Sequence, residues 1–169
     1  VFTLAGQFVR TQLAPGSALT GAVALSADGA AVISLGGKDS ALAQRMDPSG
    51  ELGSRFGVPL APVPSYWDFS AIKQEIRDGR VPAVMRNLTL PVMAPHGPTW
   101  LCLSAEGIIE RYSTTDSLVW RTALDEPEFL AIRDEFFQRN RADSSANRLY
   151  SLSLFAGAQA LGNEVWVLV

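Results

Sequence analysis

Apolar residues along this chain fall into short runs separated by turn-forming residues, which is the pattern of β-strands. Residues 31–35 and 165–169 are almost continuously apolar, as in strands that are covered on both faces. Residues 108–112 and 118–122 mix apolar and polar positions, as in strands with one face toward water. The pattern predicts a mainly β protein.

The strand pattern occurs twice in the chain. Residues 25–52 align with residues 93–118, and the turn glycine Gly29 falls opposite Gly97. Each copy contains a strand, a glycine turn, two further strands and, after a polar turn, a last strand. Repetition at a fixed spacing, here about 65 residues, indicates a repeat architecture.

Two turns in the first copy carry clear geometric signals. Asp28-Gly29 predicts a two-residue hairpin, because both residues accept a positive φ. The Asp-Pro-Ser-Gly segment at 47–50 predicts a second turn, in which proline fixes φ and glycine closes the turn. These signals favour antiparallel strands that pair with their neighbours in the chain.

Two insertions lengthen the repeat beyond the roughly 40–50 residues of compact propeller blades. In the first insertion, Phe69, Ile72 and Ile76 recur at helical intervals, and Gly79 follows them as a stop signal. The spacing predicts a helix within residues 67–78.

The second insertion predicts a longer helix over residues 126–140. Asp125 is the expected cap, and Pro127 falls in the first turn, where its missing N–H costs nothing. Arginines at the far end suit the helix dipole. The apolar stripe of this helix comprises Phe129, Ile132, Phe136 and Phe137.

The strands and turns resemble those of bacterial six-bladed β-propellers of the NHL-like group. The residues that carry the resemblance are Asp28-Gly29 and residues 44–52, 110–112 and 164–168. The resemblance implies antiparallel four-stranded propeller-like blades. The expected fold is a partial or atypical β-propeller of about two to three blades, with one or two short helices in its insertions.

The whole chain, residues 1–169, is expected to form a single propeller-like domain. Residues 6–11 resemble the outer strand that follows the polar turn of each full copy. The expected parts are an outer strand of a partial blade at 1–15, blades at 20–57 and 88–123, a partial blade at 149–169, and insertions at 58–87 and 124–148.

The length of the chain departs from the family pattern. At roughly 40–45 residues a blade, six blades take about 250 residues, and this chain has 169. An open stack of blades is expected to expose unpaired strand edges and an uncovered apolar face. Either the chain is a segment of a longer protein, or its insertions complete a smaller closed fold, or other protein subunits cover the exposed edges.

Composition narrows the range of functions. Hydrophobic residues make up 47% and charged residues 18%, which predicts an ordered core. The net charge is −3 and no basic stripe is present, so no nucleic-acid partner is expected. No apolar run approaches the roughly 20 residues of a membrane-spanning helix, so association with a membrane complex would be peripheral.

The chain has few residues of the types that usually act in catalysis or bind metals. With one histidine, His96, and one cysteine, Cys102, the chain cannot assemble a cysteine-rich zinc site or a histidine-dependent triad. Most aspartates fall in turns, where they bond their own backbone, and no spacing selects a pair for acid–base work. The sequence predicts no catalytic residue, no cofactor and no metal site.

Aromatic and arginine residues in the insertions are the best candidates for binding a partner, because interfaces favour Trp, Tyr and Arg. Packing on the sheets is the alternative interpretation of the aromatic side chains. The candidates are Tyr66, Trp67 and Phe69 in the first insertion, and Phe136, Phe137, Arg139 and Arg141 in the second.

The resulting hypothesis is a non-catalytic protein-interaction or scaffold module, an accessory subunit of a larger, membrane-associated bacterial complex. Resemblance to secreted and periplasmic propellers favours the periplasm or cell envelope. The alternative is a ligand- or metal-binding propeller enzyme fragment, similar to lactonases or quinoproteins, by fold analogy alone.

Overall fold

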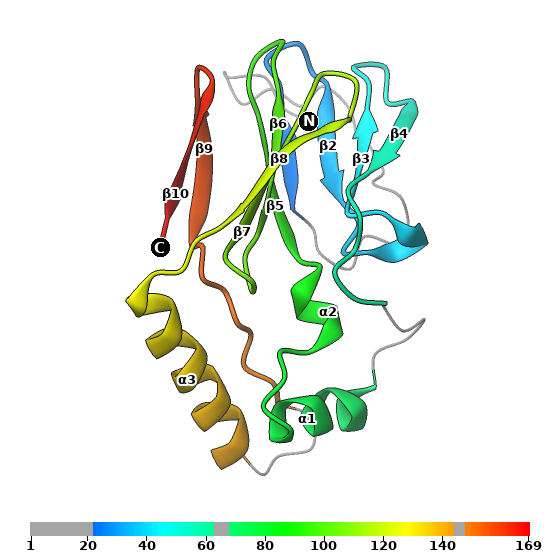
Figure 1. Ribbon diagram of the computed structural model, residues 1–169. Helices are drawn as coiled ribbons and strands as arrows, with labels where there is room; N and C mark the ends of the chain where they lie inside the picture. The colour runs from blue at the N-terminus through cyan, green and yellow to red at the C-terminus, as the bar shows by residue number, and fades with distance from the viewer. Residues whose placement is uncertain (1–21, 63–67, 144–147) are drawn as a thin grey trace, which may run out of the picture.

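The computed structural model describes residues 22–62, 68–143 and 148–169. Within these ranges the protein is mainly β (Figure 1), with two four-stranded antiparallel sheets, one two-stranded sheet and three α-helices. The elements in chain order are β1 (Val23–Leu25), β2 (Ala31–Ser34), the 3-10 helix η1 (Lys38–Ser40), β3 (Ala43–Met46), β4 (Leu52–Phe56), α1 (Phe69–Arg77), α2 (Ala83–Arg86), β5 (Thr89–Met93), β6 (Thr99–Leu103), β7 (Ile108–Tyr112), β8 (Leu118–Ala123), α3 (Pro127–Ala142), β9 (Gly157–Leu161) and β10 (Glu164–Leu168).

Within each sheet, strands that are adjacent in space are also consecutive in the chain. Sheet 1 has the order β1-β2-β3-β4, sheet 2 the order β5-β6-β7-β8, and sheet 3 consists of β9 and β10. All pairings are antiparallel. The prediction of antiparallel four-stranded, propeller-like blades is therefore confirmed.

The three sheets lie side by side, with sheet 2 in the middle (Figure 1). On one face of sheet 2, Leu101 and Leu103 pack with Val32 of sheet 1. On the other face, Trp100 and Cys102 belong to the cluster against which Val167 of sheet 3 packs. All five residues of β6 are buried, because both faces of this strand are covered, and this explains why four of the five are apolar.

Polar contacts also join sheets 1 and 2, between side chains of β3 and β4 and side chains at the start of β6 and in the turn before β8. Arg45 Nε lies 2.6 Å from Asp116 Oδ1, and Arg45 Nη2 donates to Thr99 Oγ1 at 3.0 Å. The Ser54 hydroxyl also donates to Asp116. Asp116 has a φ of 62° at the turn position that Gly50 occupies in the first copy, and its carboxylate thereby reaches across to sheet 1.

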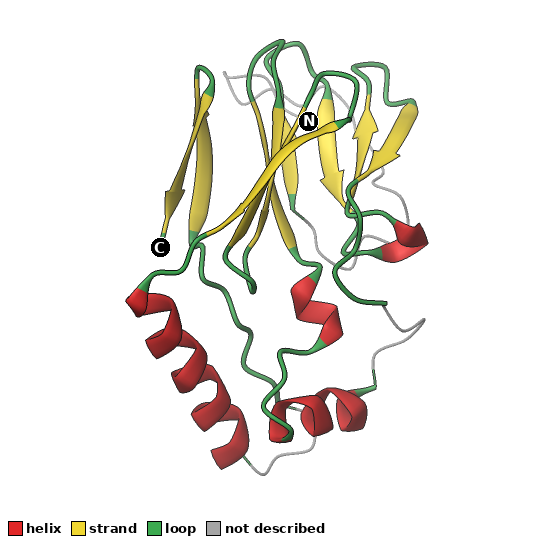
Figure 2. Ribbon diagram, viewed as in Figure 1, coloured by secondary structure: helices red, strands yellow, loops and turns green. Residues whose placement is uncertain are grey.

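The insertions place their helices at one end of the sheets (Figure 2). Helix α1 begins where predicted, because Asp68 Oδ1 accepts hydrogen bonds from the N–H groups of Ser70 and Ala71 at 2.9 and 3.2 Å. It ends before Gly79, whose φ of +75° is the left-handed conformation typical of that position. Helix α2 is an additional single turn that the sequence did not predict.

Helix α3 begins one residue later than predicted and has Pro127 in its first turn. The expected cap Asp125 is wrong, because the N-cap residue is Glu126 and its side chain makes no capping hydrogen bond. Phe129 and Phe136 are buried in the same cluster as Ile76 of α1. This shared cluster holds the two insertions together.

The hairpin between β1 and β2 differs from the two-residue turn predicted at Asp28-Gly29. The strands end at Leu25 and resume at Ala31, so the loop is longer than two residues. Among the residues of this loop, Gly29 alone has a positive φ, 90°. The Asp28 carboxylate accepts a hydrogen bond from Ala30 N at 3.0 Å. A short polar side chain bonding its own turn replaces the second left-handed residue.

Candidate interaction sites

The structure separates the predicted partner-binding residues. Tyr66 and Trp67 lie outside the described residues. Phe69 is the first residue of α1 and is 37% exposed. Phe136 is 4% exposed and packs edge-on against Phe137 at 5.1 Å between ring centroids, so its side chain belongs to the core.

The two predicted arginines of α3 differ in their surroundings. Arg139 is exposed and pairs with Glu135 one turn earlier at 2.5 Å. The Arg141 guanidinium lies 5.5 Å from the centre of the Phe137 ring, a cation–π arrangement. Arg141, and not Arg139, lines a pocket together with residues of α1.

A pocket of about 490 Å³ lies between α1 and the end of α3. It brings together Phe69 and Arg141, one predicted residue from each insertion. The sequence did not single out the other residues of this α1–α3 groove. Its full lining is Phe69, Ser70, Lys73, Ile76, Arg77, Asn140, Arg141 and Asp143.

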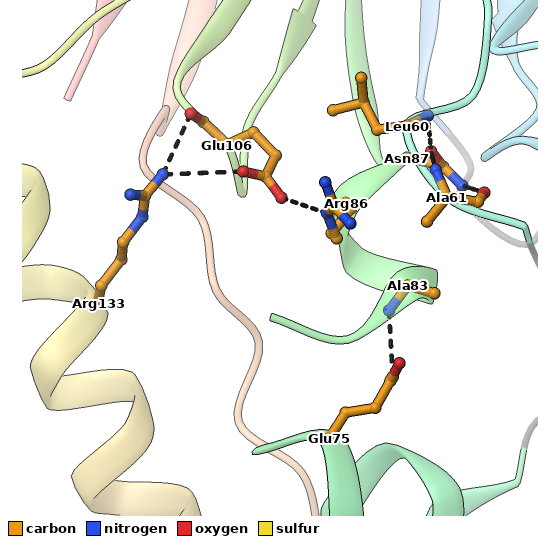
Figure 3. A network of polar contacts seen from close by, with 8 residues as sticks. All are labelled: Leu60, Ala61, Glu75, Ala83, Arg86, Asn87, Glu106 and Arg133. Carbon is orange, nitrogen blue, oxygen red and sulfur yellow. Dashed lines mark hydrogen bonds and ion pairs between the residues drawn. The ribbon is translucent and has the colours of Figure 1, made fainter. Parts of the chain in front are cut away.

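A carboxylate between β6 and β7 fixes both insertions to sheet 2 (Figure 3). Arg86 at the end of α2 donates through Nε to Glu106 Oε1 at 2.6 Å. From the other side, Arg133 of α3 donates through Nη2 to the Glu106 carbonyl oxygen at 3.2 Å. Arg86 and Arg133 are 20 and 27 positions from Glu106 in the sequence, so no local sequence pattern predicts these contacts.

Two further contacts orient the first insertion (Figure 3). The buried Asn87 side chain accepts from Leu60 N at 2.7 Å and donates to the Ala61 carbonyl oxygen at 2.7 Å. Glu75 of α1 accepts from Ala83 N at the start of α2 at 3.2 Å. The helices that form the groove are thus tied to sheet 2 by hydrogen bonds, α3 directly and α1 through α2.

Sheet 3 has one covered and one open face. Cross-strand partners Ala158 and Val167 pack against the core, as do Ala160 and Val165. The alternate residues point away and form the outer face of sheet 3. Its members are Gly157, Gln159, Leu161, Glu164, Trp166 and Leu168, and their pairs across the strands are Gly157 with Leu168, Gln159 with Trp166, and Leu161 with Glu164.

The outer face of sheet 3 exposes three large apolar side chains. Leu161 is 52%, Trp166 59% and Leu168 66% exposed. The prediction that residues 165–169 are covered on both faces is therefore wrong, because sheet 2 packs against one face only. Monomeric proteins rarely leave large side chains of this kind grouped in water.

The opposite end of the stack is partly covered. Ala31, Ile33 and Met46 lie on the face of sheet 1 that points away from sheet 2, and all three are buried. On the same face of sheet 1, the cross-strand partners Val23, Leu25 and Leu52 are 46%, 69% and 45% exposed, so apolar side chains are open at both ends of the described stack.

Neither Cys102 nor His96 lies in an environment typical of a catalytic residue. Burial raises the pKa of Cys102 to about 12, so its thiol stays protonated and a poor nucleophile. His96 lies in the exposed turn between β5 and β6. The described ranges contain no group of three or more His, Cys, Asp or Glu residues placed to hold a metal ion. No helix within those ranges is long and apolar enough to cross a membrane.

One buried carboxylate lies between sheets 1 and 2. Glu110 is fully buried, and it accepts from Arg121 Nε at 2.7 Å and from the Tyr112 hydroxyl at 2.6 Å. Burial raises the pKa of Tyr112, and the bond to Glu110 raises it further. The tyrosine therefore stays a neutral donor, and the group is a structural ion pair.

Comparison with known proteins assigns no family. No protein-family model matches the chain, and no curated protein sequence matches it. Among solved structures, selenomethionine-substituted virginiamycin B lyase from Staphylococcus aureus is similar, with 17% sequence identity and a TM-score of 0.41. The match covers 75% of this chain and 34% of that one, so the chain spans about a third of the length of the protein it resembles.

Proposed function

We propose that this chain is a non-catalytic interaction module, and that the outer face of sheet 3 binds a blade-like β-sheet of another protein subunit. The exposed, grouped side chains of Leu161, Trp166 and Leu168 carry the proposal. A module of this kind acts as an accessory or scaffold subunit of a larger complex.

The form of the partner follows from the stacking inside this chain. Sheet 2 buries its apolar residues under sheet 1 on one side and sheet 3 on the other. Sheet 3 presents Leu161, Trp166 and Leu168 on the face that points away from sheet 2. A further sheet stacked on it would repeat the packing already present twice.

The energetic incentive for covering this face is substantial. Burying one Trp or Leu side chain contributes about 1.5–3 kcal/mol, and three such side chains share the outer face. Trp166 lies between Leu161 and Leu168 on this face, and a central tryptophan surrounded by smaller apolar residues is typical of interface hot spots. Its indole N–H lies 3.3 Å from Glu164 Oε2, so a partner does not have to supply an acceptor.

Replacing Trp166 by Glu tests this proposal. An uncovered apolar face is expected to make the isolated chain self-associate weakly, so its average mass should rise above 18.2 kDa as concentration increases. Trp166→Glu places a charge in the centre of the face and is expected to keep the chain monomeric. Static light scattering over a wide concentration range measures both.

Trp120→Glu is the matched control, since Trp120 is an exposed tryptophan of β8 in sheet 2, at 38% exposure. This variant is expected to associate as the unmodified chain does. The proposal fails if the unmodified chain stays monomeric at every concentration, or if both variants reduce association equally.

A further inference from the structure

We propose that the α1–α3 groove is a second binding site, which takes an acidic peptide segment of a partner protein. This site is separate from the outer face of sheet 3. It is formed by the insertions and not by the repeated strands.

Charge is the first argument. Lys73, Arg77 and Arg141 line the groove, and Asp143 is its one acidic residue. The Asp143 carboxylate pairs with Arg148 at 3.6 Å. The chain as a whole carries a net charge of −3, so this local excess of positive charge opposes the overall balance.

The counter-charge does not come from the parts of the chain outside the described ranges. Residues 1–21, 63–67 and 144–147 contain no Asp or Glu. Among the described residues, neither Arg77 nor Arg141 forms an ion pair, and Arg141 instead stacks on Phe137. A bound carboxylate would supply the missing charge.

The spacing on α1 is the second argument. Ser70, Lys73 and Arg77 are three and four residues apart, so they form one stripe of the helix. Like charges at i and i+4 destabilise a helix by about 0.2–0.5 kcal/mol. Favourable interaction with the helix dipole accounts for Arg77, which lies in the last turn. The groove side of α1 thus carries two cations four residues apart, Lys73 and Arg77.

Shape favours a peptide over an extended polyanion. The groove is a hollow of about 490 Å³, within the roughly 300–1,000 Å³ of sites that enclose small ligands or single segments. Its lining includes the apolar side chains of Phe69 and Ile76 beside the cations. Glutamate side chains with apolar neighbours match both parts of this lining.

Fluorescence anisotropy with a labelled peptide of alternating Glu and Leu residues tests this site. Saturable binding that weakens with added salt is expected, while the same peptide with Gln in place of Glu should not bind. Arg77→Glu is expected to weaken binding about tenfold or more, since it replaces a cation of the groove by an anion.

Arg139→Glu is the matched control, because it makes the same charge change on α3 at an exposed position outside the groove lining. It should leave peptide binding within about twofold, and thermal unfolding would verify that both variants are folded. Trp166→Glu should also bind the peptide normally, which separates this site from the outer face of sheet 3.

Three results would overturn the proposal. Equal weakening by Arg77→Glu and Arg139→Glu would show a response to net charge alone. Equal binding of the Gln peptide would remove the role of carboxylates. Tighter binding of a DNA oligonucleotide, of vesicles with anionic lipid or of inorganic phosphate, again lost in Arg77→Glu, would assign the groove to a different class of ligand.

Discussion

Arg121→Ala is expected to lower the free energy of unfolding by about 3 kcal/mol, because it leaves a buried carboxylate without its cation. Glu110 is fully buried, and Arg121 lies opposite it on the neighbouring strand β8. After the substitution, the Tyr112 hydroxyl is the one side-chain donor to that carboxylate that remains among the described residues. A single neutral donor does not offset the cost of burying a charge. Denaturant unfolding, with midpoint and slope fitted separately, measures the loss.

A double variant separates the ion pair from the packing around it. Glu110→Gln removes the buried charge, and its amide oxygen still accepts from Tyr112. Combined with Arg121→Ala, it is expected to recover most of the lost stability, because no unpaired charge remains. If Arg121→Ala alone changes the unfolding free energy by less than about 0.5 kcal/mol, the carboxylate is not buried as described.

Trp100→Ala is expected to cost about 3–5 kcal/mol, the range for truncating a large aromatic residue in a packed core. Trp100 is 0% exposed in the middle of β6 and belongs to the cluster that joins sheet 2 with α3 and sheet 3. Its removal leaves a cavity that the surrounding strands, tied on both sides, cannot fill by small movements. Calorimetric or denaturant unfolding would measure the effect.

The comparison for Trp100 is Trp120→Ala on β8. Trp120 is 38% exposed, so its truncation removes far less buried area, and a loss of about 1 kcal/mol or less is expected. Similar losses in the two variants would contradict the assignment of sheet 2 as the doubly covered middle layer of the stack.

The fold was predictable from sequence where local chemistry decides the structure. Alternation and continuity of apolar residues located the strands, and helix α1 begins and ends at signals that are visible in the sequence, Asp68 and Gly79. The turn at residues 47–50 also forms as expected, with Gly50 N donating to the Asp47 carbonyl oxygen at 3.0 Å and a φ of 96° at Gly50. These features need no information from distant residues.

Predictions failed where the structure depends on contacts between residues that are far apart in the sequence. The apolar run at 165–169 has the same composition as a doubly covered strand, yet one face of sheet 3 is open. Composition records which residues prefer burial, and it does not record whether the covering layer belongs to the same chain. The tie between Arg86, Glu106 and Arg133 is equally non-local, so its three residues look like ordinary surface charges in the sequence.

The candidate sites were predicted in part. Aromatic and arginine clustering selected Phe69 and Arg141, which the structure places in one groove. Lys73 and Arg77 were missed because single basic residues in a helix usually mark a solvated face. Their spacing with Ser70 was available in the sequence, and it indicates a shared stripe once a helix is assigned. The facing helix, however, comes from an insertion more than fifty residues further along the chain.

Gly157→Arg is the most direct test of the central claim that the outer face of sheet 3 is a docking surface. A Cβ atom added at Gly157 would meet no atom within 4 Å in this chain, so a side chain there has open space and the midpoint of thermal unfolding should not fall. The same side chain would project from the outer face beside Leu168, where it would prevent a second sheet from stacking closely. Light scattering should therefore show concentration-dependent association for the unmodified chain and a constant mass of 18.2 kDa for the variant. Association that persists in a folded Gly157→Arg variant would contradict the proposal.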